Sequence, residues 1–157
     1  MHVRKLSVHA WWSMGFGLGL SACAPGTMGT LMGVVLAAIL SLFPHWIALL
    51  VLVGLTLYSV WAAKVFSAQL QLKDPSCIVS DEVVGFMWSV ICLPCNGGVY
   101  ACAFILFRFF DITKIGPISW LDRQNWPGWS IVLDDCCAGL FAWFFLWLLL
   151  HLRLVVV

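Results

Sequence analysis

Long apolar stretches alternate with short polar segments along this chain, and this pattern predicts membrane-embedded helices. Residues Trp46–Ala63 are eighteen consecutive positions without a charge. As an α-helix they would rise about 27 Å, close to the hydrocarbon thickness of a bilayer. A second apolar helix is predicted over Thr30–Phe43, and only Pro44–His45 separates the two. This separation is short enough only for a tight turn, so we expect the two helices to be antiparallel neighbours.

A third apolar region is interrupted at its centre. Val83–Phe107 carries no charge over twenty-five residues, but it contains the strong turn signal Pro94–Gly98. One broken span would put the charges that flank this region on opposite sides of a membrane. We instead expect a helical hairpin over residues 78–115, with helices at about Ile78–Leu93 and Val99–Ile115, because it returns the charged ends to one surface.

The two ends of the chain complete the predicted fold. A final span is expected from near Cys136 to about Leu152, and the glycine-interrupted stretch Ala10–Ala24 is expected to be a half-span or an interfacial segment. No internal repeat or linker is visible. The prediction is an all-α, polytopic membrane protein, with about four to six membrane-embedded helices in a single domain covering residues 1–157.

Composition and charge agree with a membrane protein and exclude one class of partner. The chain is 63% hydrophobic and 10% charged, its mean hydropathy is +1.03, and its net charge is +1. Nucleic-acid binding requires lysine and arginine clustered on one face, whereas here they are scattered, so we expect no nucleic-acid partner. The predicted helices place most basic residues on one side, which should be cytoplasmic. These residues are Arg4, Lys5, Lys64, Lys73, Arg108, Lys114 and Arg123, and only Arg153 lies opposite.

Acidic residues gather on that same side and are the strongest sign of chemistry. Asp81 and Glu82 are adjacent, Asp134 and Asp135 are adjacent, and Asp111 lies near the end of a predicted helix. Like charges in a low-dielectric setting repel unless cations neutralise them, and carboxylate oxygens suit Mg²⁺ or Mn²⁺. A single pair would more simply be a solvated interface. Two pairs with Asp111 on one membrane side favour a metal site.

Two other polar groupings leave two interpretations open. Arg108, Asp111 and Lys114 share one helix face, so they form either a structural ladder of ion pairs or a phosphate contact. The stretch "APGTMGTLMG" places Thr27 and Thr30 before an apolar helix, so these hydroxyls either cap the helix or help to bind an anion.

Catalysis by cysteine or histidine is disfavoured by position. Cys102 and Arg108 have the C-x₅-R spacing of cysteine phosphatases, but no glycine lies between them. The four histidines lie near the termini or on the predicted outer side, away from the acidic residues. Cys92 and Cys95 have the spacing of a redox or zinc pair, but no second pair completes such a site, which favours ordinary packing.

Four motifs follow one another along most of the chain: "GFGLGLSACAPGTMGTLMG", "IVSDEVVGFMW", "FRFFDITKIGPISWLDR" and "GWSIVLDDCCAGLFAW". Taken in this order, they resemble the motifs of the bacterial phosphatidylglycerophosphatase A family. The resemblance implies an all-helical, Mg²⁺-dependent lipid phosphatase of the bacterial inner (cytoplasmic) membrane, with its active site on the cytoplasmic face. Its substrate would be phosphatidylglycerophosphate, and its products phosphatidylglycerol and phosphate.

The resemblance also implies roles for individual residues. It places the catalytic group on Asp81, Glu82, Asp111, Asp134 and Asp135. Within this group, the implied Mg²⁺ ligands are Asp81, Glu82, Asp134 and Asp135. The implied substrate-binding residues are Thr27, Gly29, Thr30, Arg108 and Lys114. The nucleophile is left open between a water molecule and an aspartate.

Other classes of protein remain as alternatives. A phosphatidyl transferase of the CDP-alcohol type is disfavoured because its D-G-x-x-A-R core is missing. A small membrane transporter would carry ionisable groups near the bilayer midplane, whereas these gather at helix ends. A non-enzymatic scaffold would tolerate neutralisation of the acidic pairs.

Overall fold

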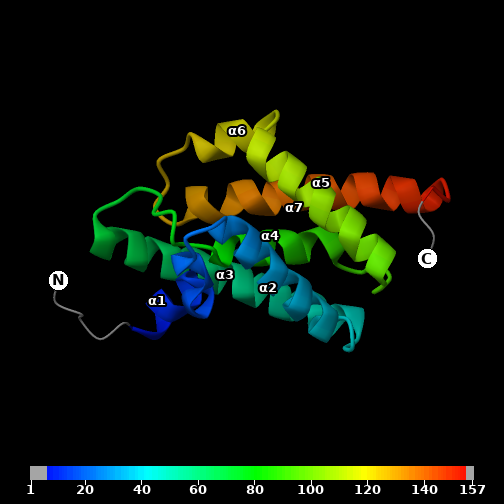
Figure 1. Ribbon diagram of the computed structural model, residues 1–157, viewed down its shortest axis with the longest axis horizontal. Helices are drawn as coiled ribbons and strands as arrows, with labels where there is room; N and C mark the ends of the chain where they lie inside the picture. Colours follow the sequence, from blue (N-terminus) through cyan, green and yellow to red (C-terminus); the bar gives the residue numbers. More distant parts are fainter. Residues whose placement is uncertain (1–6, 155–157) are drawn as a thin grey trace.

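The protein is a bundle of helices, and the prediction of an all-α fold is confirmed (Figure 1). The structure, a computed structural model, describes residues 7–154, and no β-strand occurs among them. The predicted basic residues Arg4 and Lys5 lie outside this range. The elements are α1 Val8–Ser13, the 3₁₀ helix η1 Gly15–Leu20, α2 Pro25–Leu40, α3 His45–Leu70, α4 Ser80–Val90, α5 Gly97–Thr113, α6 Pro117–Asp122 and α7 Trp129–His151.

Within residues 7–154, two helices are long and apolar enough to cross a membrane. They are α3, with 26 residues, and α7, with 23 residues. Large apolar side chains such as Leu50, Trp61 and Phe144 point outward from them, as lipid-facing residues do. The predicted apolar helix at Trp46–Ala63 is therefore confirmed.

The start predicted for the last span, near Cys136, is wrong by about two turns of helix. Helix α7 begins at Trp129, after a turn in which Gly128 adopts a positive φ of 77°. Ser130 through Leu133 are compatible with a helix, so the helix runs through the acidic pair. Asp134 and Asp135 consequently lie inside α7 and not at its end.

Helix α4 is the centre of the bundle. Nine of its eleven residues are buried, and it packs against α2, α3, α5 and α7. Its length corresponds to a rise of only about 16 Å, well short of a bilayer's hydrocarbon thickness. Residues 91–96 separate it from α5, so the apolar region with the central turn signal forms two helices and not one.

The apolar helices predicted at Thr30–Phe43 and Trp46–Ala63 were expected to be antiparallel neighbours, but they pack mainly on other helices and hardly on each other. Helix α2 begins at Pro25, five residues earlier than predicted, and packs on α4, as α3 does. Glycines allow this approach: a Cβ atom at Gly29 would lie 2.8 Å from the carbonyl oxygen of Val79, and one at Gly33 would lie 2.8 Å from that of Val83. The small residues of α2 therefore face α4.

The closest helix contact joins α4 to α7 through two glycines. A Cβ atom at Gly139 would overlap the carbonyl oxygen of Gly85. A Cβ atom at Gly85 would lie 2.9 Å from the carbonyl oxygen of Asp135. Because both residues lack a side chain, the two backbones touch directly, one turn away from the acidic residues of α4. This contact sets the distance between the carboxylates of the two helices.

The N-terminal apolar stretch is broken, in line with its glycines. Helix α1 ends at Ser13, and η1 follows with a kink at Phe16 and Gly17, whose φ angles are 55° and 102°. Neither piece is long enough to span a bilayer.

We predict that Gly139→Ala destabilises the fold by about 1–3 kcal/mol, because the added methyl group forces α4 and α7 apart. The measurement is thermal or denaturant unfolding of the purified protein in detergent. Gly54→Ala is the matched control, since Gly54 lies in α3 with no atom within 4 Å of an added Cβ. Equal stability of the two variants would show that the α4–α7 contact is not tight.

Candidate functional site

A polar cavity of about 220 Å³ lies at one end of the bundle, where four helices and the loop before α4 meet. Residues from every predicted acidic position line it. The lining residues are Pro25, Gly26, Asp74, Ser76, Ile78, Asp81, Glu82, Asp111, Lys114, Ile131, Asp134 and Asp135. Acidic side chains that are far apart in sequence thus share one cavity.

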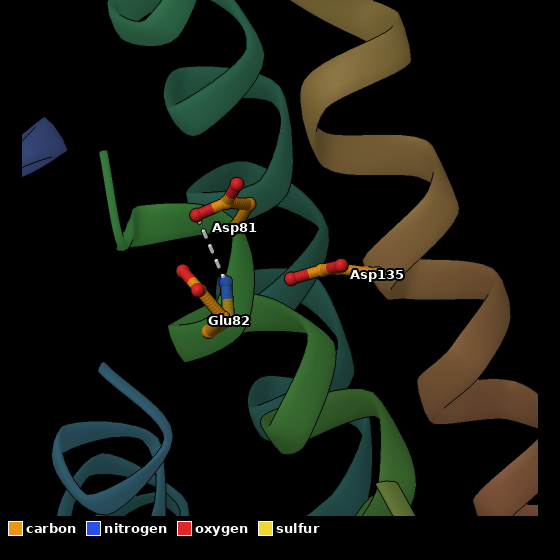
Figure 2. A group of neighbouring side chains, drawn as sticks. All are labelled: Asp81, Glu82 and Asp135. Carbon is orange, nitrogen blue, oxygen red and sulfur yellow. Dashed lines mark hydrogen bonds between the residues drawn. The ribbon is translucent and has the colours of Figure 1, made fainter. Parts of the chain in front are cut away.

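Three carboxylates form the core of the site. Asp81 and Glu82 occupy the first turn of α4, and Asp135 reaches them from α7 (Figure 2). One oxygen atom of each lies within 4.8 Å of the other two. Asp81 also accepts a hydrogen bond from the backbone N–H of Glu82 at 3.1 Å. Asp81 and Asp135 are buried, so water screens their charges only weakly.

This arrangement fits a hard divalent cation. Three negative charges so close together, two of them on buried side chains, repel one another strongly unless protons or a cation offset them. Oε2 of Glu82 is buried and has no hydrogen-bond partner within the described part of the chain. An all-oxygen donor set with an unpartnered oxygen matches the ligand preference of Mg²⁺ and Mn²⁺.

Asp134 differs from its predicted role as a metal ligand. Its Oδ2 accepts a hydrogen bond from Nζ of Lys114 at 2.8 Å, and it lies outside the group of three carboxylates. Adjacent residues on an α-helix point about 100° apart, and here Asp135 lies close to Asp81 and Glu82 while Asp134 binds Lys114. Its second oxygen, Oδ1, is buried and has no partner among the described residues.

Lys114 holds two carboxylates at once. It binds Asp134 and also Asp122, the last residue of α6. Burial lowers the pKa of Lys114, but hydrogen bonds and the charges of Asp122 and Asp134 outweigh burial and raise this pKa above the ordinary lysine value. Lys114 is therefore a permanent cation in the cavity wall, and much of its charge is already matched by these two partners.

Arg108 and Asp111 form the ion pair that their spacing on α5 allowed. Asp111 lines the cavity, and the guanidinium group of Arg108 lies beside Gly26 at the start of α2. A Cβ atom at Gly26 would be 3.2 Å from Nη1 of Arg108 and would overlap a carboxylate oxygen of Glu82. Gly26 thus leaves room for the guanidinium group of Arg108 and the carboxylate of Glu82 beside the N-terminus of α2.

Three predicted substrate-binding residues lie away from the cavity. Thr30 is fully buried, and its hydroxyl donates a hydrogen bond to the carbonyl oxygen of Gly26 at 2.8 Å, which stabilises the first turn of α2. Gly29 packs against Val79 and the Cβ atom of Glu82. Thr27 is half-buried and does not line the cavity. Helix α2 presents only its first two residues, Pro25 and Gly26, to the cavity.

Sequence reasoning missed three polar residues of the site. Asp74 and Ser76 belong to the loop before α4 and line the cavity, and Asp122 binds Lys114 from α6. Asp74 and Ser76 lie outside the acidic pairs and outside any apolar periodicity. Only the observation that their loop leads directly into the first turn of α4 could have identified them.

The apolar outer surfaces and the buried acidic cavity define a helical membrane protein with a polyacidic site at one end of its bundle. The phosphatidylglycerophosphatase A family model matches residues 11–150. Phosphatidylglycerophosphatase A of Escherichia coli is 33% identical over 132 residues, covering 83% of this chain and 76% of that protein. The chain belongs to the phosphatidylglycerophosphatase A family.

Two further relatives match over a similar share of the chain. Phosphatidylglycerophosphatase A of Haemophilus influenzae is 36% identical over 141 residues, covering 83% of this chain and 81% of that protein. A Bacteroides thetaiotaomicron protein, provisionally named a phosphatidylinositol-3-phosphatase, is 34% identical over 137 residues, covering 82% of this chain and 84% of that protein. No solved structure matches the chain.

Proposed function

We propose that this chain hydrolyses the terminal phosphate monoester of phosphatidylglycerophosphate in the acidic cavity, giving phosphatidylglycerol and inorganic phosphate. Membership of the family supports the reaction. The observation that carries the site is the meeting of Asp81 and Glu82 from α4 with Asp135 from α7 in one buried group. The Bacteroides relative is named for another lipid phosphomonoester, so the reaction class is the same.

We propose Mg²⁺ as the cofactor, held by Asp81, Glu82 and Asp135. When bound, the ion would supply positive charge that offsets the phosphate and makes water more acidic. The three carboxylates would orient the ion, and Gly85 and Gly139 would keep the helices that carry them at a fixed separation. Asp134, included among the metal ligands in the sequence-based prediction, is assigned another role.

The remaining polar groups are proposed to bind the phosphate and to move protons. Arg108 and the backbone N–H of Gly26 in the first turn of α2 would contact phosphate oxygens, because a helix N-terminus attracts anions. Asp111 would orient Arg108 through their ion pair. Asp134, whose Oδ2 is fixed by Lys114, would accept a proton from the attacking water at Oδ1. The new bond joins water oxygen to phosphorus, and the bond from phosphorus to the glycerol oxygen breaks, with a proton passing to that oxygen.

We further propose how the bundle lies in the bacterial inner membrane. Helices α3 and α7 would cross it, α2 and the α4–α5 hairpin would be embedded beside them, and the cavity would face the cytoplasm. The charge distribution supports this orientation, since Lys114 lies at the cavity end, whereas Arg153 follows the far end of α7. A cavity at the end of the bundle, and not at its middle, favours an enzyme over a transporter.

Removal of divalent cations should abolish hydrolysis. Replacement of either Asp81 or Asp135 should reduce hydrolysis to a small residual rate. We expect Asp81→Asn and Asp135→Asn each to lower kcat/KM at least about 100-fold, because each loses one charge that would hold the cation. The measurement is phosphate release from phosphatidylglycerophosphate by purified protein, with Mg²⁺ and with excess chelator.

Arg123→Gln is the control for that experiment, because it neutralises an exposed charge that follows α6 and does not line the cavity. Its activity should stay within about threefold of wild type, as expected for an exposed surface charge. Full activity in chelator would exclude the cofactor. Full activity of both Asn variants would exclude the three-carboxylate site.

Two exposed cysteines test the orientation. Cys23 lies two residues before Pro25 in the cavity wall, whereas Cys92 lies just beyond the far end of α4. In variants that retain only one of the seven cysteines, either Cys23 or Cys92, a maleimide that cannot cross the inner membrane should label Cys92 in intact cells. It should label Cys23 only after that membrane is permeabilised. The reverse pattern would place the cavity on the outer face.

A further inference from the structure

The cavity end of the bundle carries a group of exposed tryptophans that the proposed reaction does not use. Trp120 lies in α6, Trp126 in the loop that follows, and Trp129 at the first position of α7. Their exposed fractions are 57%, 42% and 43%. We call these three residues the aromatic patch. Trp120 and Trp126 contact edge to face, with ring centroids 5.7 Å apart.

The patch is attached firmly to the site. Lys114 and Gly116 both adopt positive φ angles, 45° and 62°, so the chain turns sharply after α5 and α6 packs on the first turns of α7 (Figure 1). Ile118 is fully buried beneath α6. Asp122, at the other end of α6, binds Lys114 in the cavity wall. Movement of the patch would therefore move the cavity wall.

The chemistry of the patch matches the boundary between lipid and water. Indole rings combine a large apolar face with one N–H donor, and tryptophan is enriched where membrane proteins pass from hydrocarbon to headgroups. Trp129 begins one of the two helices long enough to cross a membrane. Exposed Phe109, Ile112 and Ile115 at the end of α5 add to the apolar surface at this end of the bundle. This continuity with the apolar outer surface favours lipid over a second protein as the partner.

We propose that the aromatic patch is an interfacial anchor that binds the lipid bilayer at the level of the headgroups and the first acyl carbons. Asp135 lies six residues after Trp129, a helix rise of about 9 Å along α7 toward the membrane interior. An anchored patch thus fixes how far below the membrane surface the acidic cavity lies, and with it the access of lipid phosphates to the cavity. The inference that the anchor positions the cavity rests on the proposed function, whereas the inference that the patch binds the bilayer does not.

Fluorescence quenching tests the anchor without any need for activity. Wild type and the double variant Trp120→Ala/Trp126→Ala are reconstituted in vesicles of phosphatidylcholine and phosphatidylglycerol with brominated acyl chains. The difference in fluorescence emission between wild type and the double variant is the emission of Trp120 and Trp126. Bromine near the headgroup end of the chain should quench it at least about twice as strongly as bromine near the methyl end. Quenching by neither lipid would mean that water or protein covers the aromatic patch. Stronger quenching by the bromine near the methyl end would place the patch in the hydrocarbon. Either result would overturn the proposal.

Kinetics test the consequence for catalysis. The double variant should lose about tenfold in kcat/KM on long-chain phosphatidylglycerophosphate in vesicles, because the cavity is no longer held at the correct depth. It should keep its activity on a short-chain analogue dissolved as monomers. Trp120→Tyr/Trp126→Tyr should restore the vesicle rate, since tyrosine also prefers the interface. Trp46→Ala, which removes an exposed tryptophan from the start of α3, should change neither rate.

The outcomes separate the two proposals. An equal loss on both substrates, without rescue by tyrosine, would indicate a structural role for the patch and contradict the anchor. Shallow quenching in a wild-type protein that hydrolyses neither substrate would leave the anchor in place and overturn the proposed function instead.

Discussion

The direct contact between the backbones of α4 and α7 is the constraint on which the site depends. Gly85 and Gly139 allow this contact because neither has a side chain to separate the helices. Asp81 and Glu82 precede Gly85 by one turn, and Asp135 precedes Gly139 by one turn. The carboxylates therefore meet because the glycines meet. In a membrane, where apolar burial contributes little to helix association, such close packing of small residues is a main source of specificity.

The same contact creates an electrostatic cost that the rest of the site must offset. Three carboxylates, two from the first turn of α4 and one from α7, lie close together. The basic side chains around them form ion pairs with other acidic residues. Lys114 is shared between Asp134 and Asp122, and Arg108 is paired with Asp111. The positive charges thus pair with Asp111, Asp122 and Asp134, and Asp81, Glu82 and Asp135 form no ion pair with a described residue. This division of charge is what a resident divalent cation requires, and it separates Asp134 from the residues that would bind one.

Much of this arrangement could be predicted from sequence, and the reasons are local. Uncharged runs identify α3, the Pro94–Gly98 signal separates α4 from α5, and adjacent acidic pairs identify the important positions. Helix register could not be predicted with the same certainty. The Asp134–Asp135 pair looked like the boundary of a span, but α7 starts at Trp129, so the two side chains point in different directions and only Asp135 joins the cluster.

Tertiary contacts explain the other differences. Thr27 and Thr30 precede an apolar run, a position that fits either a helix cap or an anion site. Helix α2 packs on α4 through Gly29 and Gly33, which leaves only its first residues at the cavity. Asp74, Ser76 and Asp122 lie in segments without periodicity, and only the folded chain brings them to the site. Patterns along the sequence thus identify elements and charges, whereas the assignment of each charge to a partner depends on how the helices cross.

The central claim is that Asp81, Glu82 and Asp135 share one divalent cation. Anomalous diffraction at the manganese edge, from crystals of the wild-type protein grown with Mn²⁺, tests it most directly. The account predicts a single strong peak within about 2.0–2.3 Å of an oxygen atom from each of the three carboxylates. A peak bound by Asp134 in place of Asp135, or no peak between α4 and α7, would contradict it.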